Sequence, residues 1–190
     1  MMNSGDEKRI VEKAKQGDDA AFALLVGRYA DSTFAFVRRI VANREEAEDA
    51  VQETFIKAWS NLRKFDGRSS FQTWLWRIAC NTALSAVRHD TAAAKKIVKA
   101  SDRLWETIPD EDVEAFFAGE SYDGRVAALN RAIAVLSPDE KALIMLYYYD
   151  EKSIAECAAI LGLSESNAKV QLHRIRKKLY ATIKQQTDER

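Results

Sequence analysis

The chain has 190 residues, which is enough for one ordinary domain or two small ones. It contains only 7 Gly and 2 Pro, while Ala, Leu, Ile, Lys and Glu are abundant, and this composition predicts a mostly helical protein. The formal net charge of +0 excludes a uniformly basic nucleic-acid binder, so any binding to nucleic acid must depend on how the charges are distributed.

The two cysteines and the hydropathy of the chain indicate the cellular compartment in which the protein is found. Cys80 and Cys157 both lie on apolar faces of predicted helices, which indicates a reducing environment and no disulfide framework. The N-terminus lacks an apolar core of signal-peptide length, and no run approaches the roughly 18 apolar residues of a membrane span. We therefore expect a cytoplasmic, soluble protein with no membrane segment of its own.

Residues 1–90 are predicted to form one compact helical domain. Apolar positions at helical spacing predict helices within 6–29, through 34–40 as a continuation or a restart, over 43–62 and over 71–88. A break at Gly17 leaves Asp18 or Asp19 to cap the second helix. The polar segment 64–70 cannot stay helical through Gly67, so it is predicted to be a turn.

Between residues 91 and 125 the helical pattern fails. From Glu106 to Gly124 there are seven acids and no Lys or Arg, with Pro109 and two glycines. We interpret 91–125 as an acidic linker, in which short helical turns can form, rather than as a third domain. A helix resumes at 126, and Pro138 suits the first turn of the helix that follows.

The last domain, 126–190, contains the pattern of a helix-turn-helix. A short amphipathic helix over Ser153–Ser164 leads into a turn at Gly162, and Ser164 can cap a second helix. The second helix has a predicted buried stripe of Ala168, Leu172, Ile175 and Leu179. From Lys169 to Lys184 there are six Lys or Arg and no acid. Periodicity alone leaves two interpretations open, a DNA-reading helix and a merely solvated basic face.

An acidic face is predicted on the 43–62 helix. Five acids occur within 43–53, against the single base Arg44. Four positions share one helical face: Asp49, Gln52, Glu53 and Ile56. Such a face repels DNA and suits a basic protein partner. The alternative is that acids complement the helix dipole, which explains Glu45 and Glu46 but not Glu53.

A basic edge follows along the chain. Residues 57–88 carry six Lys or Arg against the single acid Asp66. Aromatic side chains at Phe71, Trp74 and Trp76 flank this edge, so it could hold a nucleic-acid strand by phosphate contacts and base stacking. Trp74 lies on the apolar stripe and favours a core position, whereas the pattern leaves Trp76 open.

No catalytic or metal-binding set stands out. His89 and His173 are far apart in the sequence, and each lies beside an Arg, which suits phosphate better than metal. The two cysteines lack CxxC spacing, and the chain has no Gly-rich phosphate loop and no nucleophile elbow. We therefore predict a binding protein that is not an enzyme and needs neither cofactor nor metal.

Three segments of the first domain, 17–29, 46–59 and 71–81, closely resemble ECF-type (extracytoplasmic function) sigma factors of bacterial RNA polymerase. The C-terminal helix-turn-helix resembles the second domain of that family. The resemblance implies an all-α protein with a sigma region 2-like bundle at 1–90, an acidic linker at 91–125 and a region 4-like domain at 126–190. It implies a non-catalytic subunit that binds core RNA polymerase, directs promoter-specific transcription initiation and has an anti-sigma factor as a further partner.

The resemblance also assigns residues to roles. The polymerase-binding set is Glu48, Asp49, Gln52, Glu53 and Ile56. The set for the −10 promoter element, where an unstacked base is captured, is Phe65, Arg68, Ser69, Ser70, Arg77 and Asn81. The set for the −35 element is Ser166, Asn167, Lys169, Val170, His173, Arg174 and Lys177, and we also expect Lys178 to contact phosphate. The acidic linker resembles the family segment that threads the polymerase near the RNA path.

One departure from the family and one alternative remain. The second helix opens on Asn167–Gln171 where family members often have Thr-Val-Lys-Ser-Arg, which implies fewer phosphate contacts than usual. The alternative is a free-standing helix-turn-helix regulator that dimerises through its N-terminal domain. The acidic face of 45–53 and the helix of 71–81 distinguish the two, because a dimeric repressor needs neither.

Overall fold

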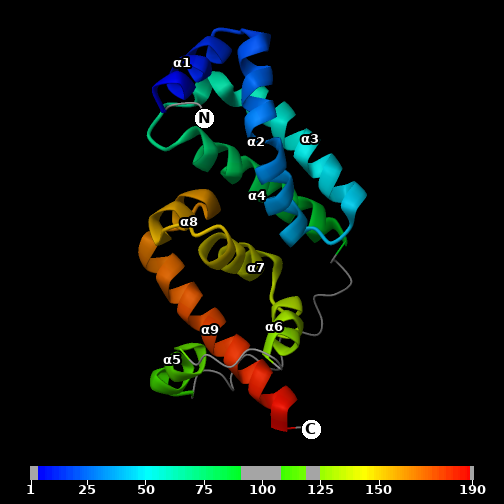
Figure 1. Cartoon of the computed structure of the whole chain (residues 1–190), viewed down its shortest axis with the longest axis vertical. Helices are drawn as coiled ribbons and strands as arrows, with labels where there is room; N and C mark the ends of the chain where they lie inside the picture. The colour runs from blue at the N-terminus through cyan, green and yellow to red at the C-terminus, as the bar shows by residue number, and fades with distance from the viewer. Residues whose placement is uncertain (1–3, 91–107, 119–124, 189–190) are drawn as a thin grey trace. The chain divides into compact units, whose positions relative to one another are not determined.

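The structure is a computed structural model that describes residues 4–90, 108–118 and 125–188. All the regular elements in these ranges are helices, which confirms the all-α class (Figure 1). The chain divides into two compact units, one made mainly of residues up to His89 and the other mainly of residues from Asp90 onward.

The first unit is built from four α-helices and one short turn. They are α1 (Ser4–Lys15), α2 (Asp19–Ile40), α3 (Arg44–Asn61), the 3-10 turn η1 (Leu62–Lys64) and α4 (Phe71–Asp90). The cap of α2 is Asp18, whose carboxylate accepts a hydrogen bond from the Ala21 N–H at 2.9 Å. From there α2 runs unbroken to Ile40, so the apolar positions at 34–40 continue the helix and do not restart it.

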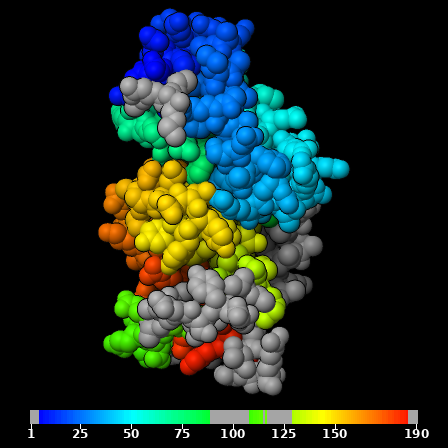
Figure 2. All heavy atoms as spheres, viewed as in Figure 1, coloured from blue at the N-terminus to red at the C-terminus, as the bar shows by residue number. Residues whose placement is uncertain are grey.

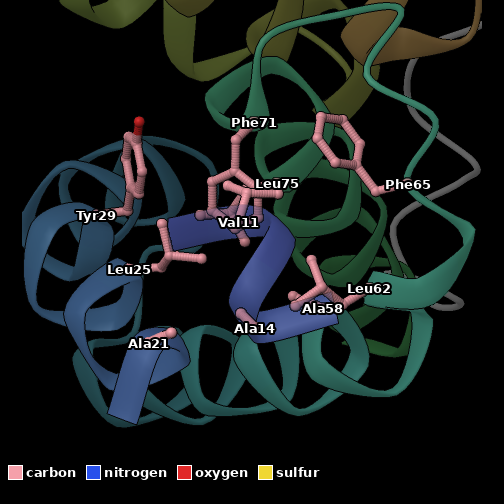
Figure 3. Close-up of a cluster of buried hydrophobic side chains, with 10 residues drawn as sticks. All are labelled: Val11, Ala14, Ala21, Leu25, Tyr29, Ala58, Leu62, Phe65, Phe71 and Leu75. Carbon is pink, nitrogen blue, oxygen red and sulfur yellow. The ribbon is translucent and has the colours of Figure 1, made fainter. Parts of the chain in front are cut away.

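A cluster of buried side chains joins α1, α2 and the ends of α3 and α4 (Figure 3). Its members are Val11, Ala14, Ala21, Leu25, Tyr29, Ala58, Leu62, Phe65, Phe71 and Leu75. The Tyr29 hydroxyl points away from the cluster and donates to the Glu7 carboxylate at 2.7 Å. Burial, reinforced by this hydrogen bond, raises the pKa of Tyr29 to about 12. The bond ties α1 to α2.

The two tryptophans of α4 have different environments. Trp76 is 4% exposed and stacks on Phe36 of α2, with ring centroids 5.0 Å apart and an interplanar angle of 5°. Trp76 is therefore a core residue, a position that the sequence pattern left open. Trp74 is half-buried and packs on Phe65 and Phe71, at centroid distances of 5.2 and 5.6 Å, which agrees with the predicted core position.

By length and composition alone, α2 is the one described helix that could cross a membrane, with 22 residues and a mean hydropathy of 1.2 in its most apolar stretch. In the structure, several of its apolar side chains are buried inside the protein. Leu25, Phe36 and Val37 are fully buried in the helical bundle. One face of this long helix therefore belongs to the core of the first unit.

After α4 the described chain forms α5 (Asp110–Ala118), α6 (Arg125–Ala134), α7 (Pro138–Ile144), the π-helical turn η4 (Met145–Tyr149), α8 (Ile154–Leu161) and α9 (Glu165–Asp188). Helices α5, α6 and α7 all pack on α9. The predicted stripe on α9 is confirmed, since Ala168, Leu172, Ile175 and Leu179 are all buried. Helix α5 lies inside the predicted linker 91–125, of which residues 91–107 and 119–124 are outside the described residues.

Ser137 and Glu140 form a reciprocal capping box at the start of α7. The Ser137 hydroxyl accepts from the Glu140 N–H at 3.3 Å, and the Glu140 carboxylate accepts from the Ser137 N–H at 2.9 Å. Pro138 occupies the first turn, as predicted. The second carboxylate oxygen of Glu140 accepts from Lys178 Nζ at 2.9 Å, so the cap also anchors α9.

Candidate nucleic-acid and protein interfaces

The five residues of the predicted polymerase-binding set form one exposed stripe along α3. All of them are solvent-exposed, and Ile56 retains 66% of its surface despite being apolar. The buried residues of α3 are Ala47, Ala50, Thr54 and Ala58, which lie on the opposite side of the helix. A single exposed Ile is common on protein surfaces, so the acidic stripe around it is the more specific feature, and it suits a basic protein partner.

Two acids of this stripe have neighbours on α3 itself. Glu48 accepts from Arg44 at 2.8 Å, and Glu53 lies 2.8 Å from Lys57. Both are exposed i,i+4 pairs, which contribute little to stability and are readily exchanged for an external partner. The other acids at the helix start, Glu45 and Glu46, have their N–H groups capped by Asn43. A favourable interaction with the helix dipole therefore explains Glu45 and Glu46. The acids of the exposed stripe need a different explanation.

The segment between η1 and α4 carries four of the six residues that the sequence assigns to the −10 element. Gly67 has φ +74°, a left-handed conformation that L side chains rarely adopt. The Asp66 carboxylate accepts from the Arg68 N–H at 3.0 Å and pairs with its guanidinium at 3.1 Å. The Arg68 side chain is nevertheless 90% exposed. The turn thus presents a cation to solvent at the edge of the aromatic cluster.

The remaining residues of this set divide between surface and core. Ser70 caps α4, because its hydroxyl accepts from the Thr73 N–H at 3.1 Å, and Ser69 is half-buried beside it. Arg77 and Asn81 are exposed one turn apart on α4. Phe65 differs from the prediction. It is 8% exposed and belongs to the hydrophobic cluster, so its ring holds the turn in place and does not face solvent.

Helix α8 and helix α9 form the predicted helix-turn-helix. Gly162 has φ +69°, and the Leu163 N–H closes the end of α8 by donating to the Ala158 carbonyl at 2.9 Å. Ser164 then caps α9 by accepting from the Asn167 N–H at 3.2 Å. The helix predicted over Ser153–Ser164 is shorter in the structure, Ile154–Leu161, because Ser153 caps its start and the left-handed Gly162 ends it.

We predict that Ser153→Ala lowers the stability of the second unit by about 1 kcal/mol. The Ser153 hydroxyl and N–H both donate to Glu156, at 2.8 and 3.0 Å, and these bonds lower the pKa of Glu156. The stability that Glu156 contributes is complete above its ordinary pKa and is lost as pH falls through the lower folded value. Urea unfolding of the variant should therefore show a smaller loss on acidification.

The control for this experiment is Ser60→Ala. Ser60 is an exposed hydroxyl inside α3 that donates to the Ile56 carbonyl and caps no helix. Its removal should change stability by less than about 0.5 kcal/mol. Equal losses from the two serines at every pH would contradict the capping role of Ser153.

Most of the predicted −35 set is exposed on α9. Ser166, Asn167, Lys169, His173 and Arg174 are solvent-exposed, and the apolar Val170 retains 48% of its surface. These residues lie away from the buried stripe, as the periodicity predicted. Lys177 is the exception, because its side chain is only 12% exposed.

Four contacts of α9 with other helices were not predicted from the sequence. Lys178, expected at phosphate, is bound to Glu140 and its side chain is 21% exposed, so it braces α9 against α7. Arg176 donates to the Tyr148 hydroxyl of η4. Asp110 of α5 contacts two members of the −35 set, with its carboxylate 3.2 Å from His173 Nε2 and 2.6 Å from Lys177 Nζ. The hydrogen bond from Lys177 lowers the pKa of Asp110.

The described part of the chain shows no group of three or more His, Cys, Asp or Glu side chains that could hold a metal ion. Both cysteines are buried thiols. Burial raises the pKa of Cys157 to about 11, so its thiol stays protonated and unreactive at neutral pH.

Known proteins resemble both units. Residues 25–92 match the family Sigma-70 region 2, and residues 127–179 match the family Sigma-70, region 4. The ECF RNA polymerase sigma factor SigW of Bacillus subtilis is 30% identical over 183 residues, which cover 90% of this chain and 94% of the relative. The ECF RNA polymerase sigma-E factor of Haemophilus influenzae is 47% identical over 77 residues, 40% of each chain.

Solved structures show the same fold over most of the chain. CnrH, in complex with the cytosolic domain of CnrY, aligns with a TM-score of 0.63 and 26% identity over 92% of this chain and 95% of that chain. The sigma factor RpoE from Bartonella quintana, in complex with the anti-sigma factor NepR, shares the fold at a TM-score of 0.58 and 22% identity, over 86% and 96%. The chain belongs to the ECF-type sigma factors. The region 2 match favours this family over a free-standing helix-turn-helix regulator.

Proposed function

We propose that this ECF-type sigma factor docks on core RNA polymerase through the acidic stripe of α3 and reads promoter DNA with two separate surfaces. The observation that carries the docking role is the position of the stripe directly opposite the buried residues of α3, with Ile56 66% exposed among acids. An acidic rim around an apolar centre fits a basic, apolar surface on a protein and repels DNA.

The turn around Gly67 and the exposed side of α4 are proposed to hold the −10 element. Extruding a base from a duplex costs a few kcal/mol, which contacts at the site must offset. Arg68, Arg77 and Asn81 are exposed and supply charge and hydrogen bonds. Phe65 supports this site from the core, as does Ser70 by capping α4. An extruded base would thus contact a turn whose backbone is held in place by side-chain packing.

The exposed face of α9 is proposed to read the −35 element in the major groove. A helix that follows a tight turn presents its N-terminal half to base edges. Lys169, Val170 and Arg174 occupy that half and are exposed. Arginine can pair bidentately with guanine, and Val170 can contact the methyl group of thymine.

This sigma factor is further proposed to act in the cytoplasm, without enzymatic activity of its own, and to be held inactive by an anti-sigma factor. CnrH, at 26% identity, was solved with the cytosolic domain of a second protein, CnrY. The exposed Ile56 and Val170 give a covering protein apolar anchors on both functional faces. Purification of the protein from its own cells and identification of what co-purifies, besides core polymerase, test this part.

Arg174→Ala should cost roughly 1–3 kcal/mol of promoter binding and relax the preference at one or two −35 positions, because Arg174 faces the groove. Run-off transcription on a library of −35 variants measures it. The matched control is Lys178→Ala, which removes a cation that is bound to Glu140. That variant should unfold more easily and keep its sequence preference. If Arg174→Ala weakens every promoter by the same factor, Arg174 contacts phosphate only.

A further inference from the structure

The burial of Lys177 is unusual for its position on α9. Lys177 lies two positions from both Ile175 and Leu179, which is roughly 200° around the helix in either direction. Ile175 and Leu179 are buried in the unit, so Lys177 points directly away from the core. An outward lysine should be exposed, yet its side chain is 12% exposed. Another element must cover this side of α9.

That element is α5, which lies beside the C-terminal half of α9 (Figures 1 and 2). In Figure 2 the green atoms of α5 adjoin the orange and red atoms of α9. The Asp110 carboxylate lies 2.6 Å from Lys177 Nζ and 3.2 Å from His173 Nε2. Phe116 meets Tyr180 edge to face at 5.2 Å, and Val113 is 3% exposed.

These contacts place one carboxylate against two members of the set predicted for the −35 element. His173 and Lys177 both belong to the face proposed to enter the major groove, and one acid binds both of them. The apolar contacts of Val113 and Phe116 hold that acid in place. A duplex that approached this half of α9 would have to displace α5 first.

We propose that α5 is an autoinhibitory helix, which in the free protein covers the part of the recognition helix that carries His173 and Lys177 and competes with DNA for these two side chains. The inference rests on the proposed −35 role of α9. The helix has only 9 residues, and the Asp110 side chain that contacts α9 is itself 59% exposed, so the cover is reversible. The apparent DNA affinity is then reduced by the fraction of molecules in which α5 is displaced.

The test compares two alanine variants of the full chain. Asp110→Ala removes the acid that contacts α9, and Glu111→Ala removes an exposed acid from the same first turn of α5. Fluorescence anisotropy at low salt measures the affinity of both variants and of the unaltered protein for a mixed-sequence DNA duplex. Asp110→Ala should bind about 3- to 10-fold more tightly, and Glu111→Ala should change binding by less than about 2-fold.

A third variant separates masking from bulk charge. Val113→Ser changes no charge but weakens the apolar contact of α5, and it should also bind the duplex about 3-fold or more tightly. In the unaltered protein, saturating duplex should speed the hydrogen exchange of the α5 backbone amides, because DNA and α5 exclude each other. A merely structural α5 would show no such increase.

Three results would overturn the masking: equal gains from Asp110→Ala and Glu111→Ala, no gain from any variant, or unchanged exchange in α5 on adding DNA. Run-off transcription with core polymerase is the separate arm. If one of these three results is obtained while the unaltered protein and all the variants support transcription, the proposed function stands and only the masking by α5 is refuted. Tight duplex binding by Asp110→Ala without any transcription would refute the sigma-factor function and keep α5 as a cover of a DNA-binding helix.

Discussion

Asp49→Arg combined with Glu53→Arg should weaken binding to core RNA polymerase by about 100-fold or more, because like charges facing each other across an interface cost several kcal/mol. Both acids are exposed on the stripe of α3 that lies opposite the core. Glu53 pairs with Lys57 on the same helix, and an exposed pair of this kind adds little to the free energy of unfolding. The folded state should therefore keep its stability to within about 1 kcal/mol.

The control is Asp6→Arg combined with Glu12→Arg. These two acids are exposed on α1, and each pairs with a neighbour on its own helix, at 3.4 and 3.0 Å. The control makes the same change in net charge but leaves the stripe of α3 intact, so polymerase affinity should change by less than about 3-fold. Affinity titrations with core polymerase, together with circular dichroism, decide the matter. Unchanged affinity in a folded Asp49 and Glu53 variant would remove the docking assignment.

Phe71→Ala should destabilise the first unit by about 3–5 kcal/mol, as expected for removing a buried aromatic ring. Phe71 is 3% exposed and its ring meets those of Tyr29, Phe65 and Trp74 at 5.4, 5.9 and 5.6 Å. The same rings hold the turn around Gly67. Loss of Phe71 should thus also reduce −10 recognition in molecules that remain folded.

Urea unfolding measures the first effect, and run-off transcription well below the unfolding midpoint measures the second. Gln72→Ala is the neighbouring control, because Gln72 is a half-buried polar side chain outside the hydrophobic cluster. It should cost less than about 1 kcal/mol. A loss below about 1 kcal/mol for Phe71→Ala would show that the aromatic cluster does not hold the turn.

Local features of the fold were predictable from the sequence because they depend on neighbouring residues. Asp18 and Ser137 precede helices at the positions where their side chains can reach free N–H groups, and both act as caps. The buried stripe of α9 followed from spacing alone. The exposed acidic stripe of α3 followed in the same way, since the pattern fixes which side is apolar.

Contacts between distant segments were not predictable. Trp76 is buried because Phe36 of α2 lies against its ring, and nothing near Trp76 in the sequence indicates this. Lys178 lies at the edge of the buried stripe, where its ammonium group could face solvent or pair with an acid. In the structure it pairs with Glu140 of α7. Asp110 belongs to an acidic segment that periodicity could not place on α9. The only sequence feature that pointed to this contact is the opposite charge of the acidic segment and of α9.

Run-off transcription with purified core RNA polymerase tests the sigma-factor function most directly. The template carries −10 and −35 elements selected from a randomised promoter library with this protein present. We predict a defined transcript that requires both core polymerase and this protein, and that disappears when Asp49 and Glu53 are both replaced by Arg. A transcript formed equally well without this protein, or no transcript from any promoter in the library, would contradict that function.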